Sequence, residues 1–203
     1  SIIRATMYVW IVAVYPTIVG ETVLKSADHP TVSAVSVAGT DWTVPRSGGY
    51  EGMALQPETG LLWAMLEKPL LGADGQPEGA FLRAMAFDPA RGEWTGAAFK
   101  FALAEGATAI GDFNFIDATR ALVIERDNGE GDPSLMCAGD PAPDCFPVPA
   151  MIKRIVLIDT ATVDAEGFVR RIGHVDLMDI ADPDGLNRME TAAAQDMAGK
   201  MTF

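Results

Sequence analysis

The feature that most constrains the fold is an internal repeat of one antiparallel unit. In residues 48–104 and again in 105–180, short apolar runs are separated by turn residues rich in Gly, Pro and Asp. The runs lie at 49–55, 61–67, 81–88 and 93–103 in the first copy, and at 109–115, 120–125, 152–159 and 168–177 in the second. A repeat of roughly 60 residues made of four antiparallel strands is typical of a β-propeller blade.

Matched charged residues support the repeat. Arg83 and Asp88 enclose an apolar run with the same spacing as Arg154 and Asp159, and a turn follows each aspartate. We also expect the acids to match between copies, Glu51 with Asp112 in the first strand and Glu67 with Glu125 at the end of the second. The rival architecture, a β-sandwich of unrelated strands, would not predict matched carboxylates.

The sequence therefore predicts an all-β fold of β-propeller-like four-stranded antiparallel blades. We expect N-terminal strand material and a lead-in at 1–47, one blade at 48–104, a second with a cysteine loop at 105–180, and a helix-like tail at 181–203. A propeller closes with at least about four blades, and two alone would leave long unpaired edges. The expectation is thus an incomplete propeller, a fragment of a longer protein.

Charge excludes one class of function. The chain has 15 basic and 28 acidic residues, a net charge of −13, and lacks the clustered Lys and Arg that nucleic-acid binding requires. We therefore expect no nucleic-acid partner. The motifs of serine esterases, zinc proteases, P-loop proteins and dinucleotide-binding proteins are also absent, and the two histidines, His29 and His174, have no triad-like surroundings.

The apolar segment from Met7 to Val14 has two readings. Pro16 and Glu21 cut it short of the roughly 20 residues of a membrane-spanning helix, so we expect no transmembrane helix. A buried strand explains it best. The alternative is a segment that docks on a partner or a membrane protein.

Cys137 and Cys145 are the only cysteines, and they flank a stretch rich in Pro, Gly and Asp. Such a stretch can fold back and bring the two thiols together, so we expect a disulfide and an oxidising compartment. Two free or buried thiols are the alternative. A zinc site is disfavoured because no further ligands lie nearby in the sequence.

Carboxylates are the remaining candidates for chemistry. In a propeller the first strand of each blade lines the central channel, so Glu51 and Asp112 would face it, with Glu67 and Glu125 close by. Converging carboxylates favour a hard cation such as Ca²⁺. Alternatively these acids are structural, accepting hydrogen bonds from turn amides and pairing with basic side chains (Arg46, Arg126 or Lys68).

The acidic segment 125–132, which includes Glu125, Asp127 and Asp132, is the sharpest local feature. Its oxygen-bearing side chains and two glycines could wrap Ca²⁺, although the spacing does not match the EF-hand pattern. A solvated acidic loop explains the segment equally well.

Several motifs resemble the bacterial phytase-like domain family, which is described as having esterase-like activity of phytase. The resemblance covers about residues 16–185 and excludes most of the opening segment. The matching motifs lie at 26–30, 46–54, 111–114, 121–129, 144–146, 153–155 and 176–183.

This resemblance implies a secreted or periplasmic, propeller-like hydrolase of phosphate or carboxylic esters, with Ca²⁺ as the expected cofactor. It carries over candidate site residues by position: Glu51, Asp112, Glu125 and Arg126 as catalytic, and Glu51, Asp112, Glu125 and Asp127 as metal ligands. The chain departs from the family in lacking most of the blades of a complete member.

Two functions follow as hypotheses. In the first, Ca²⁺ held by the four carboxylates polarises a small phosphate or ester substrate, with Arg126 or Lys68 as an electrostatic clamp. The metal would offset the net charge of −13, which otherwise repels phytate. In the second, the chain is a non-catalytic propeller-type binding or assembly module within a larger complex.

Overall fold

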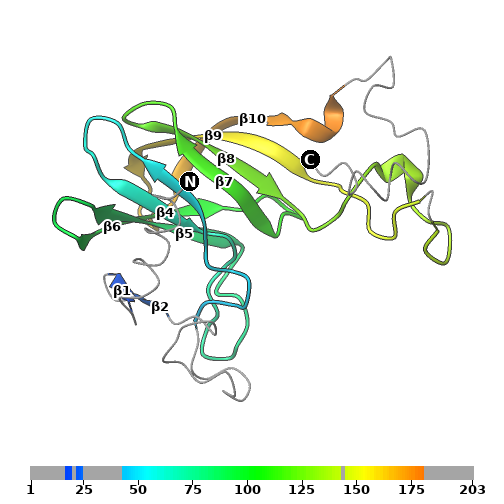
Figure 1. The fold of residues 1–203 in the computed structure, drawn as a ribbon, viewed down its shortest axis with the longest axis horizontal. Coiled ribbons are helices and arrows are strands. Elements are labelled where there is room, and N and C mark those ends of the chain that lie inside the picture. The colour runs from blue at the N-terminus through cyan, green and yellow to red at the C-terminus, as the bar shows by residue number, and fades with distance from the viewer. Residues whose placement is uncertain (1–16, 20–21, 25–42, 143–144, 181–203) are drawn as a thin grey trace.

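The computed structural model describes residues 17–19, 22–24, 43–142 and 145–180 (Figure 1). Within these residues the fold is all-β, with two four-stranded antiparallel sheets and two short 3-10 helices. A two-stranded hairpin of β1 (Thr17–Val19) and β2 (Thr22–Leu24) stands apart from both sheets. The predicted all-β fold of propeller-like blades is confirmed.

Each sheet is a meander in which strands that follow one another in the sequence are hydrogen-bonded neighbours. The first sheet contains β3 (Tyr50–Leu55), β4 (Leu62–Leu66), β5 (Phe81–Asp88) and β6 (Glu93–Ala102). The second sheet contains β7 (Ala109–Phe115), β8 (Arg120–Arg126), β9 (Lys153–Val163) and β10 (Val169–Asp176). Short turns that contain Gly or Asp join the first strand to the second and the third to the fourth in each sheet, whereas longer connections join the second strand to the third.

The two sheets pack face to face, and their first strands, β3 and β7, lie side by side (Figure 1). Aromatic rings fill the space between the sheets. The ring centroid of Phe99 lies 5.0 Å from that of Trp63 in the same sheet and 6.2 Å from that of Phe113 in the second sheet. Gly52 allows the close approach, because a Cβ atom there would lie only 2.5 Å from Cβ of Phe113. The core is therefore shared by both blades.

The strand registers define which positions of the two sheets are equivalent. A one-residue irregularity falls at Glu51 in β3 and at Gly111 in β7, each opposite the end of the second strand. Such a bulge adds one unpaired residue to a strand. Aligning the two bulges makes Glu51 equivalent to Gly111, and Glu67 equivalent to Arg126.

The predicted match of acids between the copies is therefore wrong by one residue. Glu51 does not correspond to Asp112, nor Glu67 to Glu125, because the bulge offsets each first strand against its neighbour. The match of Arg83 with Arg154, and of the two aspartates that follow them, is confirmed by the pairing of the third strands with the second strands.

A second cluster covers the face of the first sheet that points away from the second sheet. Val44 and Leu70, from the segments before β3 and after β4, pack against Leu66 and Met85. The inner strand β4 is consequently covered on both faces, and all five of its residues are buried. This explains why β4 is a continuous apolar run rather than an alternating one.

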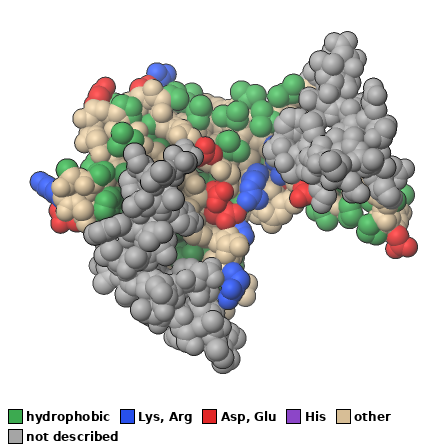
Figure 2. Space-filling model, in the orientation of Figure 1, with side chains coloured by type: hydrophobic (Ala, Val, Ile, Leu, Met, Phe, Trp, Pro, Cys, Tyr) green, Lys and Arg blue, Asp and Glu red, His purple; other side chains and the backbone are tan. Residues whose placement is uncertain are grey.

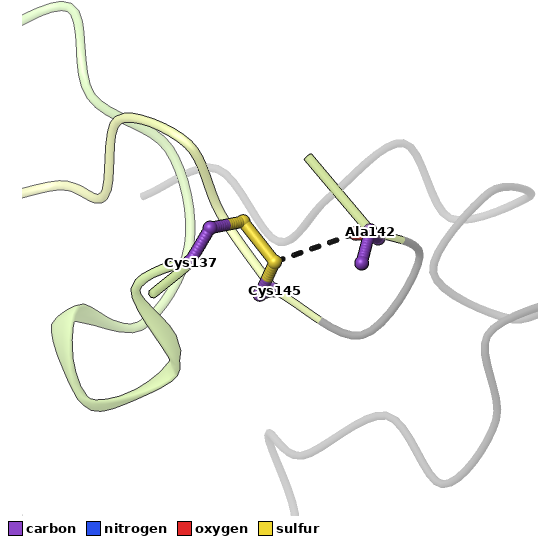
Figure 3. The surroundings of a disulfide bond; sticks show 3 residues. All are labelled: Cys137, Ala142 and Cys145. Carbon is purple, nitrogen blue, oxygen red and sulfur yellow. Dashed lines mark hydrogen bonds between the residues drawn. A yellow bond between two sulfur atoms is a disulfide. The ribbon is translucent and has the colours of Figure 1, made fainter. Parts of the chain in front are cut away.

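The predicted disulfide between Cys137 and Cys145 is present (Figure 3). It lies in the long connection between β8 and β9, after the 3-10 helix Pro133–Leu135, whose first turn is capped by the carboxylate of Asp132 through Ser134 N. The Sγ atom of Cys145 lies 3.7 Å from the carbonyl oxygen of Ala142. The disulfide thus closes a small loop at the end of this connection.

The second 3-10 helix, Leu177–Asp179, follows β10. The predicted N-terminal strand at Met7–Val14, His29 and the predicted helix-like tail at 181–203 lie outside the described residues. In the part of the chain that the structure describes, no helix has the length and apolar character needed to cross a membrane.

Candidate functional site

A cluster of charged side chains lies at the junction where the first strands of the two sheets meet. Glu51 occupies the bulge of β3, Glu67 directly follows β4, Asp112 lies on β7, and Arg126 ends β8. Arg126 joins the sheets, because its Nη2 atom donates to Oε1 of Glu67 at 2.7 Å. The backbone N–H of Ile110 also donates to the carbonyl of Glu67 at 3.3 Å.

The carboxyl group of Glu51 is the member of this cluster with a perturbed acidity. Partial burial raises its pKa, and the neighbouring negative charges of Glu67 and Asp112 raise it further. Arg126 and Lys68 act in the opposite direction, but they do not cancel the increase. A carboxylic acid whose pKa is raised beside cationic side chains is a typical setting for proton transfer.

Asp112 and Arg126 are held in place by local hydrogen bonds. Asp112 accepts from the backbone N–H of Phe113 at 2.8 Å and from Nδ2 of Asn114 at 2.9 Å. Arg126 also donates to Oδ1 of Asn128 at 3.0 Å. Figure 2 shows acidic and basic side chains next to one another near the middle of the visible face.

Glu125 points away from this cluster. Adjacent residues of a strand face opposite sides of a sheet, so Glu125 lies in the core between the sheets while Arg126 lies at the cluster. Glu125 is completely buried. Its Oε1 and Oε2 atoms accept from Nη1 and Nη2 of Arg171 at 2.8 and 2.9 Å, and Oε1 also accepts from Ala104 N at 2.7 Å.

Arg171 extends this contact into a link between the sheets. Its Nη1 atom donates to the carbonyl of Ala102 at 2.7 Å, and its guanidinium lies 5.0 Å from the ring centroid of Phe101. The ion pair with Glu125 is thus bidentate, stacked and largely shielded from water. Glu125 and Arg171 therefore form a structural clamp between the sheets, with the carboxylate buried away from the surface.

Asp127 is likewise engaged by its own chain. Its Oδ2 atom accepts from the backbone N–H groups of Met151 and Ile152, and its Oδ1 atom accepts from Gly129 N and Lys153 Nζ, all at 2.7–3.1 Å. Burial alone would raise the pKa of Asp127, but these hydrogen bonds outweigh burial and lower it. The side chain fastens the start of the β8–β9 connection to the start of β9.

Lys153 is the partner that makes this attachment possible. Its side chain is buried, and Nζ donates to three acceptors: the carbonyl of Asp127 at 3.1 Å, its Oδ1 at 2.9 Å and the carbonyl of Gly129 at 2.8 Å. An ammonium group with three donors is fully satisfied by this set. Buried polar groups of this kind are normally paired in this way.

The predicted calcium ligands therefore do not converge. Glu51 and Asp112 belong to the cluster at the blade junction, whereas Glu125 pairs with Arg171 and Asp127 with Lys153. Across the described residues, no three His, Cys, Asp or Glu side chains are grouped so that they could hold a metal ion. The four residues do not fit calcium as one ligand set.

The structure brings together three of the residues predicted from the sequence, Glu51, Asp112 and Arg126. Sequence reasoning missed Arg171 and Lys153, the partners of Glu125 and Asp127. A basic residue in the fourth strand of the second blade is a signal only if its partner is known to face inward. The buried position of Glu125 could have been found from the alternation of β8, where Ala121 and Val123 point the same way.

In the residues that the structure describes, two propeller-like blades meet at a cluster of acidic and basic side chains. Residues 20–201 match the model of the phytase-like family, described as esterase-like activity of phytase. Because this match covers most of the chain, the chain belongs to that family. A search of curated proteins and a search of solved structures both find no significant match.

Proposed function

We propose that this chain is a phytase-like hydrolase of phosphoesters and that its reaction centre is the cluster around Glu51. One observation carries this proposal: a carboxyl group with a raised pKa lies beside Arg126 and Lys68 at the junction of the blades. Membership of a family described by esterase-like activity supports the same kind of chemistry.

In this proposal Glu51 acts as the general base. Its carboxylate takes a proton from water as the water oxygen attacks the phosphorus and the bond to the ester oxygen breaks. The leaving oxygen takes a proton from solvent, and Glu51 then returns its own proton to solvent. Arg126 and Lys68 hold the anionic oxygens and offset the negative charge of Glu67 and Asp112. Glu67 positions Arg126 through their 2.7 Å hydrogen bond.

Half of the carboxylates expected to hold calcium are engaged elsewhere in the fold. Glu125 and Asp127, half of the expected ligand set, have their carboxylate oxygens occupied by hydrogen-bond donors of the chain. A calcium requirement, if measured, would have to come from other oxygen ligands.

We further propose that the protein works in the periplasm or outside the cell. The disulfide between Cys137 and Cys145 supports this location, because disulfides persist mainly in oxidising compartments. Exchange of both cysteines for serine is expected to lower the melting temperature of protein purified from an oxidising compartment, and to leave cytosolically expressed protein unchanged.

The direct test is the hydrolysis of phytate and of p-nitrophenyl phosphate by the wild type and by Glu51→Gln, each with calcium and after treatment with a chelator. Loss of the base is expected to lower kcat about 100-fold. Glu166→Gln, a change at an exposed turn position, is the matched control and retains full activity. Unchanged phosphate release from Glu51→Gln, or none from the wild type in any condition, would rule out the proposal.

A pH profile tests the role of Glu51 as a base. The base must be ionised, so activity is expected to rise as the pH passes upward through the raised pKa. Glu67→Gln removes a negative neighbour and should shift this rise to lower pH. A shift in the other direction, or none, would contradict the assignment.

A further inference from the structure

The guanidinium of Arg126 has more hydrogen-bond donors than its own chain uses. A guanidinium carries five N–H groups. Nη1 donates to Oδ1 of Asn128 at 3.0 Å and to the carbonyl of Asp127 at 3.3 Å, and Nη2 donates to Oε1 of Glu67 at 2.7 Å. Among the residues that the structure describes, none accepts a hydrogen bond from Nε. Because 28% of the Arg126 side chain is exposed, a ligand can approach it from solvent.

Gly111, on the neighbouring strand β7, lies beside this Nε atom. A Cβ atom at position 111 would lie 3.9 Å from Nε of Arg126 and 3.6 Å from Cγ2 of Ile124, which are ordinary van der Waals distances. The backbone of Gly111 is not in the left-handed region either. Neither packing nor conformation therefore requires glycine here, and its consequence is that the Nε side of Arg126 stays uncovered.

The first blade shows what a side chain at this position does. The aligned bulges make Gly111 equivalent to Glu51, and Arg126 equivalent to Glu67. Glu51 lies close enough to Glu67 that, after burial, this neighbouring charge is the main cause of its raised pKa. A long side chain at position 111 would lie against Arg126 in the same way.

Arg83 shows what the Nε side of an arginine binds in this chain. Its Nε and Nη2 atoms donate to Oε1 and Oε2 of Glu78 at 2.7 and 2.6 Å. Arginine makes such charge-assisted contacts with carboxylate and phosphate groups alike. Asp112, the acid next to Gly111, does not supply an equivalent partner to Arg126, because it accepts from the backbone of Phe113 and from its neighbour Asn114.

We propose that Nε of Arg126 is the donor that holds an anionic oxygen of the substrate's phosphoryl group, and that Gly111 is the specificity-determining residue that keeps this donor open. The inference rests on the proposed hydrolysis of phosphoesters at the Glu51 cluster. A phosphate ester presents anionic oxygens to Nε, whereas a neutral carboxylic ester presents only an uncharged carbonyl. The contact therefore favours phosphate esters over neutral carboxylic esters.

The test covers Nε by substitution at Gly111. Gly111→Gln places a neutral side chain there, and Gly111→Glu adds a carboxylate. Both should weaken the binding of inorganic phosphate, measured by isothermal titration calorimetry, about tenfold or more, because a charge-assisted hydrogen bond is lost. The KM for p-nitrophenyl phosphate should rise by a similar factor, and the KM for p-nitrophenyl acetate should stay the same.

Two controls separate this effect from charge and from folding. Gly139→Glu adds the same charge at an exposed position where a Cβ atom meets nothing within 4 Å, and it should bind phosphate as the wild type does. Gly111→Ala should keep the melting temperature of the wild type, since there is room for its methyl group. Equal weakening by Gly139→Glu and Gly111→Glu, or unfolding of Gly111→Ala, would contradict the proposal.

A double-mutant cycle tests whether Gly111 acts through Arg126. Arg126→Lys keeps the positive charge but removes the Nε donor, so it should weaken phosphate binding by itself. Gly111→Gln should then add no further loss in the Arg126→Lys background. Additive losses would show that Gly111 acts independently of Arg126, and unchanged phosphate affinity in Arg126→Lys would show that Nε makes no contact. Either result overturns the inference.

Phosphate binding and hydrolysis fail separately. A wild type that hydrolyses p-nitrophenyl phosphate but binds phosphate no better than Gly111→Gln overturns the contact and leaves the proposed function standing. A wild type that hydrolyses neither ester, yet binds phosphate more tightly than Gly111→Gln, refutes the proposed function and supports the contact. No measurable phosphate binding by the wild type overturns the contact in either case.

Discussion

At the scale of single residues, Glu125 and Arg126 are consecutive in β8 but face opposite sides of the sheet. Glu125 is buried between the sheets against Arg171, whereas Arg126 lies at the junction cluster with Glu67. Because successive side chains face opposite sides of a sheet, the two cannot serve one site. Their closeness in sequence is therefore a poor guide to shared function.

Glu125→Gln is expected to lower the free energy of unfolding by about 3 kcal/mol. The value lies at the low end for a broken buried ion pair because 27% of the Arg171 side chain is exposed. Chemical denaturation measures it. Arg170→Met, one residue away from Arg171 in β10 but solvent-exposed, is the control and should have little effect. Equal losses in the two variants would contradict the clamp.

Asp127→Asn separates a structural role from a calcium-binding role. The change weakens four hydrogen bonds and leaves the buried ammonium of Lys153 without its counter-charge. A loss of about 3 kcal/mol is expected, and it should be the same with calcium and with a chelator. Asp140→Asn, at an exposed position of the same connection, is the control. A loss seen only in calcium would show instead that Asp127 binds the metal.

At the scale of elements, short turns capped by aspartates hold the strands in order. In the β7–β8 turn, Oδ1 of Asp117 accepts from the backbone N–H groups of Thr119 and Arg120, and Oδ2 accepts from Nε of Arg120 at 2.6 Å. The hydrogen bond from Thr119 makes the largest contribution to lowering the pKa of Asp117 to about 2. Asp88 and Asp159 cap the turns that follow the third strand of each blade.

The pH dependence of stability follows from that lowered pKa. A carboxyl group with a lower pKa in the folded chain contributes stability above its unfolded pKa of 3.8, and the contribution disappears as the pH falls to about 2. Asp117→Asn should therefore be less stable than the wild type at pH 5, and the difference should vanish near pH 2. Melting curves across this range measure it. A constant difference would contradict the assignment.

At the scale of the whole molecule, the close approach of β3 to β7 decides how the blades fit together. Gly52 meets Phe113 there, and a Cβ atom would lie 2.5 Å from its Cβ and 2.9 Å from its backbone nitrogen. Nε2 of Gln56, in the β3–β4 turn, also donates to the carbonyl of Ala118, in the β7–β8 turn, at 2.6 Å. The junction that carries the Glu51 cluster depends on this contact.

Gly52→Ala is expected to destabilise the fold by about 1–3 kcal/mol, because backbone atoms of β7 must move away. Gly173→Ala in β10 is the matched control, since a Cβ atom there meets nothing within 4 Å. The control should be neutral or up to about 1 kcal/mol more stable. Both are measured by chemical denaturation, and a neutral Gly52→Ala would mean that the blades approach less closely.

The sequence by itself determined the strands, the repeat and the disulfide. Alternating apolar runs, turn residues and the spacing of Arg83 and Asp88 are local properties, and local properties survive any arrangement of the sheets. The family resemblance was equally readable, because its motifs are continuous stretches of chain.

Only the tertiary structure decided which carboxylates meet. The bulges in β3 and β7 determine which residues of the two blades are equivalent, so the acids do not match as the sequence predicted. Glu125 is buried because its side chain lies on the inward face of β8. The partners of Glu125 and Asp127 lie 46 and 26 residues away, so no local pattern predicts them. The repeat established that two blades exist, but the register between their strands determined that Glu51 and Arg126 lie at the junction while Glu125 holds the blades together.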